Sequence, residues 1–156
     1  MTENEVDIVD LLVQHELAVG ELYHKFSGRY RYHADFWEKL SSDEKKHADW
    51  LGRLREKSVI NRWLLESAGL KEPALRASIS YVRDQERKAE KVHLNIIQAL
   101  SIARDLENAL LEKQFDRTRD IAPAKYRALF TRLAEETEKH RDSITGLLKI
   151  LKEKRI

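Results

Sequence analysis

The sequence predicts an all-α protein made of four amphipathic helices and a long, partly helical crossover. Its 156 residues include only 2 prolines and 5 glycines, charged residues reach 36%, and runs of β-branched residues are scarce. This composition favours long helices over sheets. Apolar residues also recur at steps of three and four, as they do along one face of a helix. The length is that of one domain over residues 1–156 with a single core.

The first helix is expected over about residues 5–27, with Gly28 as its stop signal. Its apolar stripe also steps by three and four and contains Val9, Leu12, Glu16, Val19, Tyr23 and Phe26. Glu16 lies at the middle of this stripe, on the face that we expect to be buried.

The second helix is expected over about residues 33–57 and has the clearest stripe of the chain. Its members are Trp37, Leu40, Glu44, His47, Leu51 and Leu54. The positions between them are almost entirely charged, so the stripe should be the buried face. Glu44 and His47 therefore interrupt an apolar seam, where an isolated charge is costly. We expect them to face an opposite charge or a metal ion.

Residues 58–92 carry a weaker signal and are interpreted as a partly helical crossover. Were this segment continuous with the helix that follows, the combined helix would be too long for the rest of the chain to cover. A break is therefore expected at residues 93–95. Asn95 and Gln98 have the spacing of a capping box at the start of the next helix.

The third helix is expected over about residues 95–117, with Glu107 in the middle of its stripe. The fourth helix begins near residues 120–123, because proline is tolerated in a first turn. Thr137 and His140 occupy the middle of its stripe, three residues apart like Glu44 and His47 on the second helix. We expect the first two helices to form one antiparallel pair and the last two the other.

Composition excludes several classes of site. The chain has no cysteine, which rules out disulfides, zinc-thiolate sites, iron–sulfur clusters and thiol catalysis. The first residues are acidic and lack an apolar core, and no apolar run approaches the length of a membrane span. We therefore expect a cytoplasmic protein with no membrane partner. A net charge of +2 from 29 basic and 27 acidic residues gives no general reason to expect nucleic acid.

The residues at mid-stripe predict a metal site in the core. The candidate ligands are Glu16, Glu44, His47, Glu107 and His140. Carboxylate oxygens together with imidazole nitrogens suit iron, with manganese or zinc as alternatives. Three carboxylates in one core would repel each other unless they bound protons or cations, and metal binding resolves this conflict in helix bundles.

The Glu-x-x-His spacing alone is weak support for this site. More often, such a pair is an internal hydrogen bond or a chance occurrence. Glu21 with His24 and Glu90 with His93 share the spacing, but Glu21 lies outside its stripe and the second pair falls in the crossover. We interpret both as decoys, because specificity comes from the position in the stripe and from the match between helices.

Four segments of the chain resemble the rubrerythrin-like branch of the ferritin-like superfamily. They are Glu16-Leu-Ala-Val-Gly-Glu-Leu-Tyr23, Leu40-Ser-Ser-Asp-Glu44-Lys-Lys-His47, Leu106-Glu107-Asn-Ala-Leu110 and Leu133-Ala-Glu-Glu-Thr137-Glu-Lys-His140. The resemblance covers nearly the whole chain and implies a ferritin-like four-helix bundle. It also implies an iron oxidoreductase with peroxidase or ferroxidase chemistry. In it Glu44 is shared between metals, Glu16 and Glu107 are terminal carboxylates, and His47 and His140 are nitrogen ligands.

The fourth segment departs from the family pattern. Thr137 stands where the family carries a glutamate shared between two ions, and the neighbouring Glu136 lies about 100° away around the helix. Thr137 itself and Glu136 are the candidates for a substitute or second-shell role. One ion, or a second held weakly, is therefore expected. The chain also lacks the cysteines of a rubredoxin domain, so the resemblance implies a separate electron donor. We further expect a homodimer.

Two other interpretations remain open. The loss of a glutamate at Thr137 is also what a structural or interaction bundle with a degenerate metal site would show. The basic and aromatic turn at residues 28–33 could contact RNA, although a connection between helices explains it better. Tyr23 either bonds a ligand from the second shell or is a core aromatic.

Overall fold

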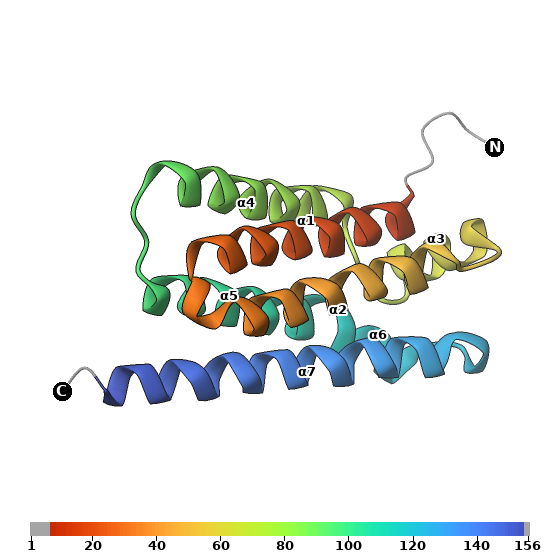
Figure 1. Ribbon diagram of the computed structural model, residues 1–156. Helices are drawn as coiled ribbons and strands as arrows, with labels where there is room; N and C mark the ends of the chain where they lie inside the picture. The colour runs from red at the N-terminus through yellow and green to blue at the C-terminus, as the bar shows by residue number, and fades with distance from the viewer. Residues whose placement is uncertain (1–6, 155–156) are drawn as a thin grey trace. The chain divides into compact units, whose positions relative to one another are not determined.

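In the computed structural model, which describes residues 7–154, all regular structure is helical (Figure 1). The all-α fold class is therefore confirmed over this range. The chain divides into two compact units, one ending at Val92 and the other beginning at His93. The expectation of a single domain stays a prediction. No helix within residues 7–154 is long and apolar enough to cross a membrane.

The first unit is built on an antiparallel helix pair, as the sequence predicted. Helix α1 (Ile8–Arg29) and helix α2 (Ala34–Gly52) are joined by the short 3-10 turn η1 (Arg31–His33). Asp7 caps α1 with its carboxylate, and the predicted start at residue 5 lies outside the described residues. Gly28 does not end the helix, contrary to the prediction, because the backbone stays helical to Arg29.

The crossover contains two helices, α3 (Lys57–Glu66) and α4 (Glu72–Lys91). Helix α1 lies between α2 and α4, and α4 runs parallel to α1 (Figure 1). The prediction that α2 continues to residue 57 is wrong. The chain leaves the helix after Gly52 and turns through Glu56, whose backbone is left-handed with φ 57°.

Helix α4 is held to α1 by a narrow apolar seam and by charged contacts. The seam consists of three buried residues at intervals of seven, Leu75, Val82 and Ala89. Beside it, Arg83 pairs with Glu21 and Lys25 pairs with Glu90. At the end of α4, the Arg29 guanidinium donates to the carbonyl of Ala89 at 2.9 Å. These contacts cover the side of α1 that faces away from α2.

The second unit begins with α5 (Ile96–Leu110), and its start confirms the predicted break and cap. The Asn95 side chain accepts from the backbone of Gln98, and the Gln98 side chain accepts from the backbone of Asn95, each at 2.9 Å. This reciprocal pair satisfies two amide groups that the first helical turn leaves without partners.

The sequence predicted that the helix beginning at residue 95 ends near residue 117, but α5 ends earlier, at Leu110. It passes into a π-helical segment, η2 (Leu111–Phe115), and then into α6 (Asp116–Ile121). Helix α7 (Ala124–Glu153) follows Pro123, which occupies the cap position rather than the first turn. Helices α5 and α7 pack antiparallel, which confirms the second predicted pair (Figure 1).

Candidate metal centre

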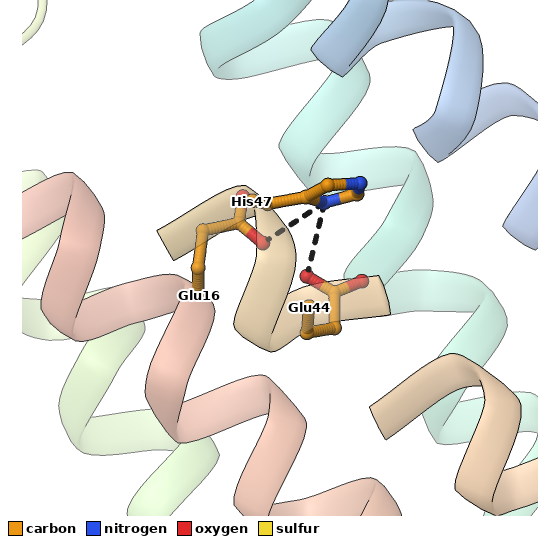
Figure 2. Close-up of side chains that lie close together, drawn as sticks. All are labelled: Glu16, Glu44 and His47. Atoms are coloured by element: carbon orange, nitrogen blue, oxygen red, sulfur yellow. Dashed lines mark ion pairs between the residues drawn. The ribbon is translucent and has the colours of Figure 1, made fainter. Parts of the chain in front are cut away.

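Three of the five predicted ligands meet inside the first unit. Glu16 comes from the middle of α1, and Glu44 and His47 come from successive turns of α2 (Figure 2). Each offers one ligand atom, and these atoms all lie within 4.8 Å of one another. The spacing therefore brought these side chains together as expected, while their role as ligands stays a prediction.

The cluster is closed to solvent. The relative exposure is 1% for Glu16 and 0% for both Glu44 and His47. His47 Nδ1 lies 3.5 Å from Glu16 Oε2 and 3.6 Å from Glu44 Oε2, as the dashed lines in Figure 2 mark. These separations exceed those of a good hydrogen bond. The three groups thus face one another at distances that leave room for a shared ion.

Burial strongly changes the proton affinity of this cluster. Desolvation, followed by the nearby Glu44 carboxylate, raises the pKa of Glu16 to about 8. For His47, burial alone would lower the pKa, but Glu16 and Glu44 outweigh it and raise the pKa to about 12. In the metal-free protein, bound protons therefore offset the carboxylate charge, as expected for acids crowded in a core.

Trp50 packs against the imidazole of His47. The two ring centroids are 5.3 Å apart and the planes are tilted by 39°. The indole restricts rotation of the imidazole, in the way that neighbours of a metal ligand commonly fix its orientation. Trp50 lies three residues after His47 on α2, so a single helix supplies both the imidazole and this support.

The other two predicted ligands meet inside the second unit. Glu107 projects from α5 and His140 from α7, and His140 Nδ1 lies 3.4 Å from Glu107 Oε1. Both side chains are buried, with relative exposures of 0% and 5%. Each unit therefore contains a buried contact between a carboxylate and an imidazole at the middle of its helix pair.

Thr137 is buried on the predicted face of α7, but its hydroxyl is bonded locally. Its Oγ1 donates to the backbone carbonyl of Leu133, one turn earlier, at 2.7 Å. Glu136 is only partly buried, and its carboxylate lies 3.5 Å from Arg132. A threonine hydroxyl in this arrangement cannot replace the charge or the reach of a carboxylate. Thr137 and Glu136 as substitute ligands stay predictions.

Tyr23 lies in an aromatic cluster two turns along α1 from Glu16. It is fully buried, and its ring centroid is 5.7 Å from that of Trp37. Trp37 also contacts Phe26 at 4.9 Å and Tyr30 at 6.3 Å. This packing accounts for the burial of Tyr23 as a core aromatic, while its predicted second-shell role remains untested.

The two decoy motifs lie on the surface. Glu21 and His24 are exposed, the first paired with Arg83 and the second 2.8 Å from Glu38. Glu90 and His93 are exposed as well. A Glu-x-x-His spacing by itself therefore does not distinguish a buried pair from an exposed one, whereas its position in an apolar stripe does.

No family model, no curated protein and no solved structure matches the chain. The resemblance to ferritin-like proteins therefore depends on the four motifs and on the way their side chains meet within each unit.

Two contacts near the cluster escaped sequence reasoning. Ser41 bonds the backbone of Gly20 across the α1–α2 pair, and Asp43 is buried although it lies between charged positions. Asp43 is paired with Lys39 at 2.8 Å and with Lys46 at 3.4 Å. Small or charged residues outside the stripe give no periodic signal, so only the packing of the helices reveals them.

Proposed function

We propose that this chain is a ferritin-like, non-haem metal-binding protein that holds iron and carries oxidoreductase chemistry of the ferroxidase or peroxidase type. The observation that carries the proposal is the solvent-free cluster of Glu16, Glu44 and His47. Buried acids of this kind need compensation by protons or cations. Manganese and zinc are alternatives that the same donors would accept.

The donor atoms fit a hard or borderline divalent ion. Both carboxylate oxygens of Glu16 are buried, and the contact of Oε2 with His47 Nδ1 at 3.5 Å is too long for a good hydrogen bond. Burying a carboxylate that makes only such a long contact costs free energy in the metal-free protein. Binding of a cation would satisfy those oxygens and release the protons that Glu16 and His47 retain.

The proposal gives each of the five predicted ligands a role. Glu44 is shared between metal positions, Glu16 and Glu107 are terminal carboxylates, and His47 and His140 are nitrogen ligands. Its support is that each unit holds a buried carboxylate–imidazole contact at mid-stripe, at 3.5 Å for Glu16 with His47 and 3.4 Å for Glu107 with His140. In ferritin-like bundles, two such pairs surround one centre.

Thr137 bears on how many ions the centre holds. With its hydroxyl turned to the Leu133 carbonyl, the α7 segment offers one imidazole and no carboxylate. We infer one tightly held ion and at most a weak second one. Iron supplies one-electron redox chemistry when bound, while the chain contributes a dry pocket, fixed ligands and the proton-holding groups.

The threonine at position 137 also favours a second candidate function. A bundle that kept its fold while losing part of its site would also show a threonine at position 137. In that case the protein is a structural or interaction module. The retained cluster of Glu16, Glu44 and His47 then serves only to hold protons.

Metal content separates the two candidates. Protein purified without chelators should contain close to one iron per chain. Titration of the metal-free protein with Co²⁺ should show binding that Glu44→Gln and Glu107→Gln each weaken by more than about tenfold. Glu21→Gln is the matched control, because Glu21 has the same Glu-x-x-His spacing on an exposed surface.

Each outcome decides a different part. Binding that is lost in Glu44→Gln but kept in Glu107→Gln would restrict the site to the first unit. No binding in wild type, with every variant behaving alike, would support the structural module.

A further inference from the structure

The backbone of α1 comes unusually close to α2 at Gly20, one turn after Glu16. A methyl group at position 20 would lie 3.3 Å from Cβ of Glu44 and 3.4 Å from the backbone oxygen of Ser41. The first distance is slightly tighter than an ordinary contact between carbon atoms, and the second is at the lower edge of ordinary contact. The stem of Glu44 therefore rests directly on the bare backbone of α1.

A buried hydrogen bond holds this approach in place. The Ser41 hydroxyl donates to the Gly20 carbonyl at 2.7 Å, from one helix to the other. Ser41 lies one turn before Glu44, and Glu44 lies one turn before His47. The contact therefore fixes the separation and register of α1 and α2 one turn away from the cluster.

Three other glycines show no such close approach. An added methyl group at Gly28, Gly52 or Gly146 would meet nothing within 4 Å. Gly28 belongs to the same helix as Gly20 and is exposed. The two positions thus differ in their neighbours and share their helical backbone.

We propose that Gly20 is a positioning residue for the metal centre. Because Gly20 has no side chain, the methylene groups of Glu44 can pack against the backbone of α1. The hydrogen bond from Ser41 holds the two helices at this separation. The Glu44 carboxylate is thereby aimed at His47 Nδ1, the same nitrogen that Glu16 approaches. The metal part of this proposal rests on the proposed function, but the aiming of Glu44 does not.

The substitution Gly20→Ala tests whether the contact between Glu44 and the α1 backbone positions the carboxylate. Gly20→Ala should weaken Co²⁺ binding by about tenfold or more, the range seen when support around a ligand is removed. It should also change the visible absorption of bound Co²⁺, because the Glu44 oxygen moves. Gly28→Ala gains the same helix propensity without the contact, and should bind Co²⁺ within about twofold of wild type.

A metal-free measurement keeps the two proposals distinct. In the NMR spectrum of the metal-free protein, Gly20→Ala should shift the ring nitrogen resonances of His47, whereas Gly28→Ala should leave them in place. Ser41→Ala adds no bulk, so it serves if Gly20→Ala does not fold. It should shift the same resonances by a smaller amount.

Shifted His47 resonances without any Co²⁺ binding in wild type would refute the metal function and leave the positioning role standing. Identical His47 resonances in wild type and the variants would overturn the positioning role, whatever metal is bound. If wild type binds Co²⁺, equal Co²⁺ affinity for Gly20→Ala and Gly28→Ala would overturn it as well.

Discussion

At the scale of single residues, the proton on Glu16 links the cluster to pH. Because burial and Glu44 raise its pKa from 4.5 to about 8, the folded protein keeps this proton where the unfolded chain loses it. The stability that this group contributes is therefore fully present below pH 4.5 and is lost as pH rises through 8. His47 acts with the same sign, since its pKa rises from 6.5 to about 12.

We expect the free energy of unfolding of the metal-free protein to fall between pH 5 and pH 8. Glu16 alone should give a slope on the order of 1 kcal/mol per pH unit, and His47 adds to it above pH 6.5. Urea unfolding in the presence of a chelator measures it. Glu16→Gln mimics the protonated acid and should flatten the slope, and equal slopes in both proteins would contradict this account.

Thr137 gives a second prediction at this scale. Thr137→Glu places a carboxylate three residues before His140, on the buried face of α7. The added charge and reach should bring metal content from near one to near two ions per chain and speed the oxidation of Fe²⁺. Metal analysis and a ferroxidase assay on both proteins measure this. If wild type already holds two irons tightly, the proposed deficit is wrong.

At the scale of helices, the sequence predicts the central parts of α1, α2, α5 and α7. It does not predict which other segments pack against them. Their polar mid-stripe residues interrupt long apolar patterns, so Glu16 and Glu44 stood out. Helix α4 was read only as part of a crossover, because its buried residues recur every seven positions and its other contacts are charge pairs with α1. A local pattern contains no information about such a partner.

The ends of helices show the same limit. The cap at Asn95 was predictable because its two hydrogen bonds lie within three residues. The end of α2 at Gly52 was not, since Leu54 continues the apolar spacing beyond it. The π-helical turn of η2 and the contact of Ser41 with Gly20 depend on packing between elements. Sequence spacing therefore located the candidate ligands but not the residues that position them.

At the scale of the whole molecule, metal binding should appear as stability. A ligand that binds only the folded state adds about 2.7 kcal/mol at a hundredfold excess over its dissociation constant. For a chain of this size, we expect Fe²⁺, Mn²⁺ or Zn²⁺ to raise Tm by about 5–10 °C. Thermal unfolding of the metal-free protein with each ion measures the effect, with Glu44→Gln as the control.

Unchanged Tm values with all three ions would favour the structural module. A rise that persists in Glu44→Gln would instead indicate binding at some other group of side chains. The comparison therefore distinguishes a specific centre from a general effect of divalent ions on a chain rich in charged residues.

The indole of Trp50, whose centroid is 5.3 Å from that of the His47 ring, should make metal binding visible in the fluorescence of the protein. A paramagnetic ion held by His47 would lie near this indole and should quench part of its fluorescence. Trp37 and Trp63 supply the rest of the tryptophan emission, so the substitution Trp50→Phe would show how much of the change comes from Trp50. Intrinsic tryptophan fluorescence can therefore report metal binding during rapid mixing without an added dye.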